Sequence, residues 1–251
     1  MRLADATWTD VRDADVDVAL VPVGSTEQHG PHAPLGTDTL DAVAVAEAGA
    51  AAYEAAANGD GAPAEAAVTP PIPVGVAEEH RAFDGTMWVS PETFRAYARE
   101  AAESLPHHGI DRVVFVNGHG GNVEALAEVA RRFSRDSAHD GYAVAFTWFE
   151  AVGEHASDMG HAGPLETALL RATNPDLVRE DRIEESHEGA ADRWGEWVSG
   201  VNLAHDSDEF TENGVVGDPS AGDVARGEAL LDLASDALAD LAVAVVDREA
   251  R

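Results

Sequence analysis

Short apolar runs alternate with longer segments of helical periodicity along most of the chain. The runs predict strands over residues 16–23, 66–73, 112–116 and 142–149, and the segments that follow predict helices over 41–57, from Ser90 to about Leu105, over 122–133 and over 164–173. Such alternation is typical of a mostly parallel sheet with helices on both faces. We therefore expect an α/β fold, and a length of 251 residues suits one domain over 1–251.

Local signals sharpen several boundaries. Ser90 followed by Pro91 favours a helix start, Asn58 with Gly59 favours a helix end, and the prolines after Thr69 should shorten the second strand or place it at an edge. Residues 179–213 are polar, acidic and weakly patterned, so we expect them near the mouth of a site or at a subunit contact. Residues 223–247 predict an amphipathic helix that packs on the sheet through Leu230, Leu233, Ala237, Leu241 and Val245.

Polar side chains with metal-binding chemistry follow two of the predicted strands. Glu27, His29 and Asp38 come after the first strand, and His119 comes after the third. Open parallel sheets bind ligands beyond the carboxyl ends of their strands, so we expect these four side chains to meet. One carboxylate can bridge two cations, and Asp38 is our candidate for that role.

The composition limits the possible chemistry and partners. Because the chain has no Cys, a metal must be held by His, Asp and Glu. The chain carries 47 Asp and Glu against 16 basic residues, all of them Arg, for a formal charge of -31. This charge repels phosphates and anionic headgroups, so we expect neither nucleic acid nor a membrane as partner, and it suits a halophilic surface. The charged amino-terminal segment does not resemble a signal peptide, so we expect a cytoplasmic protein.

Five sequence blocks in order resemble the creatininase (creatinine amidohydrolase) family. The blocks are GSTEQHGPHAPLGTDTLD, EEHRAFDGTMWV, NGHGGN, GHAGPLET and GVVGDPSAG. The resemblance implies a three-layer α/β/α sandwich, two divalent metal ions per subunit, and hydrolysis of a non-peptide C–N bond in a small-molecule amide. It also implies a homo-oligomer, often a hexamer in this family. A site of nitrogen and oxygen donors suits Zn, Mn or Fe.

The resemblance also implies roles for individual residues. Glu27, His29, Asp38 and His119 would be metal ligands with Asp38 as the bridge, and His161 and Glu166 would line the reaction centre as catalytic residues. Creatininase itself has an acidic ligand at the position of Gly121, so the second metal would need another oxygen, and Glu166 is our candidate. Creatininase also has a Trp near the position of Ser157, and its absence here argues against creatinine as the substrate.

The expected mechanism is attack of a metal-bound hydroxide on an amide carbon. His161 would carry the proton to the leaving nitrogen, and Glu166 would orient His161 or act as base. Two alternatives stay open: a formamidopyrimidine-nucleotide deformylase of flavin or deazaflavin biosynthesis, and a catalytically reduced protein that binds a metal or metabolite. The family also includes a peptidase of redox-cofactor maturation.

Several further residues near these blocks are weaker candidates. His32 is either a ligand or a partner that orients a ligand. His80 and Thr86 are candidates for contact with substrate or a neighbouring subunit, and Trp148, Trp194 and Trp197 are candidates for a pocket wall or an interface. Gly120 and Gly121 would let a ligand approach the backbone closely, with amide N–H groups available to an anionic group.

Overall fold

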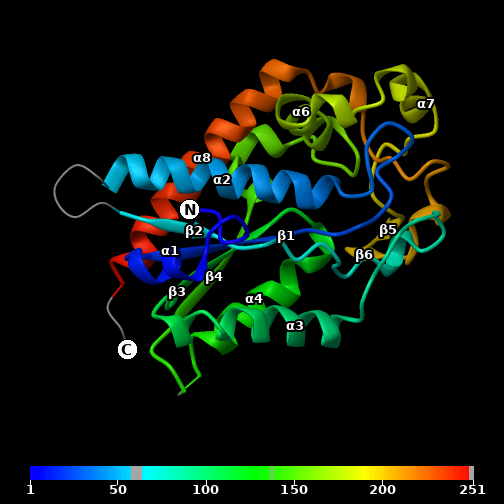
Figure 1. Cartoon of the computed structure of the whole chain (residues 1–251). Coiled ribbons are helices and arrows are strands. Elements are labelled where there is room, and N and C mark those ends of the chain that lie inside the picture. The colour runs from blue at the N-terminus through cyan, green and yellow to red at the C-terminus, as the bar shows by residue number, and fades with distance from the viewer. Residues whose placement is uncertain (58–63, 137, 249–251) are drawn as a thin grey trace.

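A four-stranded parallel sheet forms the centre of the computed structural model, which describes residues 1–57, 64–136 and 138–248 (Figure 1). The strands are β1 (Val18–Val23), β2 (Ala66–Val68), β3 (Arg112–Asn117) and β4 (Tyr142–Thr147), in the order β2-β1-β3-β4. Ala19 pairs with Val113, and Arg112 pairs with Tyr142. All residues of β1 and β2 are buried, as expected for strands covered on both faces.

Helices cover both faces of the sheet. One layer contains α2 (Thr37–Ala57), α6 (Pro164–Thr173) and α8 (Val224–Val246), and the other contains α3 (Pro91–Glu103) and α4 (Val123–Phe133) (Figure 1). Each layer buries its own apolar cluster against the sheet: Leu20 and Leu165 belong to the first, and Phe94 and Phe115 to the second. The three-layer α/β/α prediction is therefore confirmed.

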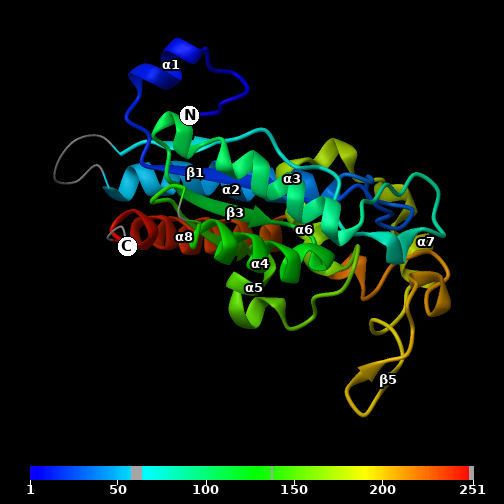
Figure 2. The same cartoon turned by 90° about the horizontal axis from the view of Figure 1, so that it is seen from below.

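The remaining elements lie around this sandwich. They include α1 (Trp8–Asp13), α5 (Trp148–Ala151), α7 (Ile183–Glu188) and a hairpin of β5 (Trp197–Val198) and β6 (Val201–Asn202), which projects from the body of the molecule (Figure 2). Short 3-10 turns occupy Glu78–His80, Pro106–His108, Gly120–Asn122, Gly153–Ala156, Pro175–Leu177, Glu180–Arg182, Ser207–Glu209 and Pro219–Ala221. Among the described helices, none has both the length and the apolarity needed to cross a bilayer.

Several predicted boundaries were wrong for local physical reasons. The first long helix begins at Thr37 and not at residue 41, which places Asp38 in its first turn, where the helix dipole favours a negative charge. The second strand ends at Val68, before the prolines, and β4 ends at Thr147, where α5 begins. Ser90 caps α3 as predicted, since its Oγ accepts a hydrogen bond from the Thr93 N–H. The predicted helix end at Asn58 and Gly59 lies outside the described residues.

The long carboxy-terminal helix packs as predicted except at one position. Leu230 and Val245 are buried against the sheet layer, and Ala237 and Leu241 are partly buried beside them. Leu233, by contrast, is 40% exposed, because the buried stripe of α8 passes through Ala234 and Leu238 instead.

Candidate metal centre

The predicted ligands meet at the carboxyl ends of β1 and β3. Glu27 and His29 lie in the loop after β1, Asp38 lies in the first turn of α2, and His119 follows β3. Glu166 joins them from the first turn of α6. All five side chains are buried, with at most 5% of any residue exposed. The loop of Gly30 to Gly36 returns the chain from His29 to Asp38 and so brings the two side chains together.

The donor atoms form two groups that share Asp38. In the first, His119 Nδ1 lies 3.2 Å from both Glu27 Oε1 and Asp38 Oδ2. In the second, His29 Nε2 lies 3.0 Å from Asp38 Oδ1 and 3.9 Å from Glu166 Oε2. Ligand atoms of a tetrahedral site with bonds of 2.0–2.1 Å stand about 3.3 Å apart, so both groups suit a small divalent cation. The two oxygens of Asp38 face different groups, as a bridging carboxylate requires.

The donor atoms of Glu27, His29, Asp38, His119 and Glu166 are called the cage below. The hydrogen bonds of the two histidines determine which ring nitrogen faces it. His29 Nδ1 lies 3.2 Å from the carbonyl oxygen of Glu27, and His119 Nε2 lies 2.7 Å from that of Val76. A carbonyl oxygen only accepts, so these nitrogens carry hydrogen and donate. The other nitrogen of each ring faces the carboxylates, and metal-binding histidines are oriented in this way by their outer N–H groups.

The carboxylates themselves are short of donors. Within the described part of the chain, no hydrogen bond reaches either oxygen of Glu27 or Oδ2 of Asp38. Buried carboxylate oxygens without partners are strongly unfavourable in a folded protein. Cations held between these oxygens and the histidine nitrogens would satisfy them, so the residues present fit a metal pair.

Burial and neighbouring charges shift the pKa values of the side chains in this cluster. Burial opposes protonation of His29, but the carboxylates around it, led by Asp38, raise its pKa to about 10. Burial raises the pKa of Glu166 to about 7. Burial would also raise the pKa of Asp38, but His29 and His119 hold it below its ordinary value. The cluster therefore retains protons at neutral pH that a bound cation would displace.

His161 enters the same cluster from the segment before α6. Its Nε2 donates to the carbonyl oxygen of Gln28 at 2.6 Å, and its Nδ1 lies 3.7 Å from Glu27 Oε1. Burial holds the pKa of His161 well below its ordinary value, so its ring is neutral. The lone pair on Nδ1 therefore faces the cage, where it can accept a proton or bind metal; Glu27, His29 and His161 form a third group of possible ligands.

Gly121 explains why an acidic ligand is missing after His119. A Cβ at this position would lie 2.2 Å from the carbonyl oxygen of Val76, a distance that real side chains do not adopt. Any side chain at 121 would require this backbone to move. The structure instead places Glu166 beside His29 and Asp38, in the second group of possible ligands.

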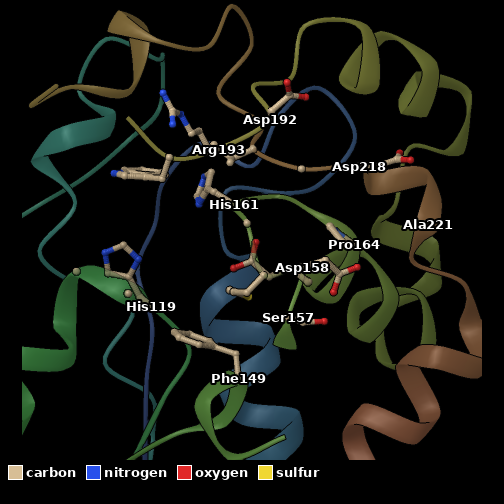
Figure 3. Close-up of a pocket in the computed structure, with 18 of the residues that line it drawn as sticks. His119, Phe149, Ser157, Asp158, His161, Pro164, Asp192, Arg193, Asp218 and Ala221 are labelled. Carbon is tan, nitrogen blue, oxygen red and sulfur yellow. The ribbon is translucent and has the colours of Figure 1, made fainter. Parts of the chain in front are cut away.

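A pocket of about 660 Å³ adjoins the cluster, and His119 and His161 are among the side chains that line it (Figure 3). Glu166 lines it too, and Phe149, Met159, Trp194 and Val216 contribute an apolar part of the lining. Ser157 lines it too, and Asp192 and Arg193 show that the excursion over 179–213 does reach the site. Sequence reasoning missed Phe149 and Arg193, which carry no motif of their own. Gly120 and Gly121 also line the pocket.

The weaker candidates fall in different places. His32 is no ligand in the described cluster, because it is held between Ser186 Oγ and Thr167 Oγ1 at 2.9 Å each, and burial lowers its pKa to about 4. Thr86 Oγ1 accepts a hydrogen bond from the Gln28 N–H.

The predicted tryptophans lie in three different environments. Trp194 lines the pocket as predicted, whereas the same prediction for Trp148 is wrong, because Trp148 is fully buried in the core. Trp197 is exposed on the hairpin.

Comparison with known proteins identifies the family. The family model for creatininase, described as creatinine amidohydrolase, matches residues 4–242. The chain belongs to the creatininase family. A mycofactocin precursor peptide peptidase of Mycolicibacterium smegmatis is 36% identical over 214 residues, which cover 85% of this chain and 79% of that protein. A creatinine amidohydrolase of Pseudomonas putida is 27% identical, over 72% of this chain and 75% of that protein.

Solved structures of the creatininase family share the fold. A creatinine amidohydrolase-like protein of Bacteroides fragilis superposes with a TM-score of 0.84 at 22% identity and covers 100% of this chain and 98% of its own. Creatininase structures with Mn and of a Zn–Zn type each give a TM-score of 0.78 at 22% identity, covering 98% of this chain and 98% or more of their own. The chain is thus a creatininase-family hydrolase with the α/β fold of these proteins.

Proposed function

We propose that this protein is a metal-dependent amidohydrolase that cleaves an amide C–N bond. The observation that carries the proposal is the pair of possible ligand groups that share Asp38, together with the pocket that His119 and Glu166 of these groups line. Glu27, Asp38 and His119 would hold one divalent ion, and His29, Asp38 and Glu166 the other. Zn and Mn, the metals named for related creatininase structures, both suit this set of nitrogen and oxygen donors. Such ions, when bound, polarise a carbonyl and lower the pKa of water.

The protein's own residues supply proton transfer and positioning. Because Nε2 of His161 is committed to the Gln28 carbonyl, Nδ1 is the atom that takes a proton from the attacking water and passes it to the nitrogen that leaves when the C–N bond breaks. Glu166 is held in place by its Oε2, which accepts a hydrogen bond of 2.6 Å from the Ala162 N–H. Trp194 lies edge-on to the ring of His161, with 6.0 Å between centroids.

We propose a peptide amide as the first substrate class, which revises the non-peptide bond expected from the family resemblance. The curated relative at 36% identity is named as a peptidase of a precursor peptide, whereas the creatinine amidohydrolase is 27% identical. A pocket of about 660 Å³ lies within the range of pockets that bury drug-sized ligands, which leaves room for a short peptide. The apolar wall of Phe149 and Trp194 favours an apolar side chain beside the cleaved bond. A small cyclic amide such as creatinine is the second candidate.

The test is a hydrolysis screen with metal-loaded protein in high salt. The panel contains short peptides with apolar residues, creatinine and a formamidopyrimidine nucleotide. We expect peptide hydrolysis that a chelator abolishes and added Zn or Mn restores, with about two metal equivalents per chain. Activity that is insensitive to the chelator would refute metal dependence. One metal equivalent per chain or none, together with no turnover, would favour the alternative of a catalytically reduced protein that binds a metal or metabolite.

The variant His161→Ala separates proton transfer from metal binding. Loss of a general acid or base lowers kcat by about 10²–10⁴-fold. We expect a loss of this size with unchanged metal content, measured by elemental analysis of the same sample. Full activity in His161→Ala would contradict the proton-transfer role, and loss of metal would show that His161 is a ligand.

The proposal extends to assembly, since the family resemblance implies a homo-oligomer. The exposed apolar side chains of the projecting hairpin, Trp197, Val198 and Val201, offer a surface for such contacts. Light scattering on the purified protein measures the mass directly, and a mass of 26.3 kDa would show a monomer.

A further inference from the structure

Gln28 stands between the proposed ligands Glu27 and His29, and its side chain has one permitted orientation. Its Nε2 lies 2.9 Å from the carbonyl oxygen of Gly214 and 2.9 Å from His80 Nδ1, and its Oε1 accepts a hydrogen bond of 2.9 Å from the Gly30 N–H. A reversed amide would set oxygen against the Gly214 carbonyl and NH₂ against the Gly30 N–H. Both contacts would then be repulsive, so the hydrogen-bond partners determine which end of the Gln28 amide is oxygen and which is nitrogen.

This orientation determines the protonation of His80. The NH₂ of Gln28 has only donors to offer, so Nδ1 of His80 must accept and carries no hydrogen. Ser207 Oγ, 3.1 Å from the same nitrogen, donates to the carbonyl oxygen of Glu79 at 2.9 Å. The remaining hydrogen of the neutral ring therefore sits on Nε2, which lies 3.4 Å from Glu27 Oε1.

His80 differs in this respect from the histidines beside it. His29, His119 and His161 each donate outward to a backbone carbonyl, so the nitrogen that each turns toward the carboxylates is the one that would offer a lone pair to a cation. His80 does the reverse, since it accepts on its outer side and presents N–H inward. Its ring stacks on His161 with 4.3 Å between centroids and an interplanar angle of 24°. His80 therefore lacks the lone pair that a ligand of this cage needs.

We propose that His80 is a positioning residue whose Nε2–H, fixed by Gln28, orients the Glu27 carboxylate for metal binding. The inference rests on the proposed metal-dependent function. The Nε2–H of His80 lies 3.4 Å from Glu27 Oε1, so its dipole can select which of the two oxygens of Glu27 turns toward the cation. Gly214 permits the arrangement, because a Cβ there would lie 1.9 Å from Gln28 Oε1.

The first test reads the tautomer directly. Long-range ¹H–¹⁵N correlation spectra of protein labelled at histidine distinguish a ring protonated at Nε2 from one protonated at Nδ1. We expect His80 to be neutral with its proton on Nε2, in the metal-free and the Zn-loaded protein alike. The signal is assigned by its absence from His80→Gln. A wild-type protein with the proton on Nδ1 of His80 would overturn the proposal without the need for any stable variant.

The second test measures Zn affinity by competition with a chromophoric chelator. Partners that orient metal ligands are each worth about 10–100-fold in metal affinity. We expect His80→Leu to weaken Zn binding by that factor, whereas His80→Gln, whose amide N–H can replace Nε2–H, should stay within a few-fold of wild type. Gln28→Glu should move the His80 proton to Nδ1 and weaken Zn binding as well. Unchanged affinity in His80→Leu, with an unchanged thermal midpoint as the folding control, would refute the role.

Neither measurement involves substrate, so the two proposals can fail separately. A protein with the expected tautomer and affinities but no hydrolysis would refute the proposed function and leave the positioning role of His80 intact. Hydrolysis by a protein in which His80 has no effect on Zn affinity would do the opposite.

Discussion

Asp38 is the residue on which the two proposed cation sites depend. Its oxygens lie 3.0 Å from His29 Nε2 and 3.2 Å from His119 Nδ1, so one carboxylate serves both groups. It lies in the first turn of α2, where the helix dipole stabilises a negative charge. Asp41, one turn further on, is equally buried but belongs to neither group, and burial holds its pKa well above the ordinary value.

This contrast gives a matched pair of variants. We expect Asp38→Asn to lose both cations, because an amide lacks the second anionic oxygen needed to bridge them. Asp41→Asn should retain both, since Asp41 belongs to neither ligand group. Elemental analysis after dialysis counts metal per chain. Two equivalents in Asp38→Asn would contradict the shared-carboxylate arrangement.

Metal binding should also depend on pH with a definite sign. The pKa of His29 is raised to about 10 in the metal-free cage, so its ring holds a proton at neutral pH that a cation must displace. Metal affinity should therefore rise with pH from 6 toward about 10 and fall as the solution is acidified. Calorimetric titration of Zn at pH 7, in buffers of different ionisation enthalpy, counts the protons released. A count of zero would contradict the protonated cage.

At the scale of elements, the contact between α6 and α8 positions part of the site. Gly227 of α8 lies so close to α6 that a Cβ would be 1.9 Å from the carbonyl oxygen of Ala168. Ala168 is two residues from Glu166, the candidate ligand at the start of α6. The place of Glu166 in the cage therefore depends on an interhelical approach that only glycine permits.

Substitution at Gly227 should affect both stability and metal content. Overpacking against a backbone carbonyl costs about 1–3 kcal/mol, so we expect Gly227→Ala to lower the free energy of unfolding by that amount. Displacement of α6 should also weaken the site that contains Glu166. The matched control is Gly49→Ala in α2, where the nearest atom is the side-chain Cδ2 of Leu238, which can move. Urea unfolding measures both variants, and equal effects would refute the argument.

At the scale of the whole molecule, the charge of -31 is the dominant feature. Exposed carboxylates repel one another most strongly in dilute salt, where the Debye length is long. One stripe of α8 shows the effect locally, because Asp232, Asp236 and Asp240 are exposed and stand four residues apart. Like charges at this spacing destabilise a helix by about 0.2–0.5 kcal/mol per pair.

The stability of the protein should therefore rise with salt. We expect the free energy of unfolding in urea to increase between 0.1 M and about 1 M NaCl and then to level off, as screening becomes complete. Replacing Asp232, Asp236 and Asp240 by Asn should stabilise the protein in dilute salt and reduce the salt dependence. A stability that is independent of NaCl, in wild type and variant alike, would refute the high-salt interpretation of the surface.

The sequence by itself determined the layers and most of the proposed ligands. Strand and helix periods depend on which face of each element is apolar, and this information is local, so the parallel sheet and the helices were predictable. Glu27, His29 and Asp38 could be grouped because a short loop joins them, and His119 because strand ends of a parallel sheet share one edge. The His161 and Glu166 block was found through the family resemblance and not through its spacing.

The tertiary structure decided what depends on close contact between distant segments. Only packing shows that Trp148 is a core residue, that position 121 excludes a side chain, and that Gln28 fixes the tautomer of His80. The apolar wall of the pocket likewise joins α5 to a segment beyond α7, which share no periodic pattern. Periodicity predicts the direction of a side chain, whereas hydrogen-bond partners and steric limits arise only when residues far apart in sequence are brought within a few ångströms.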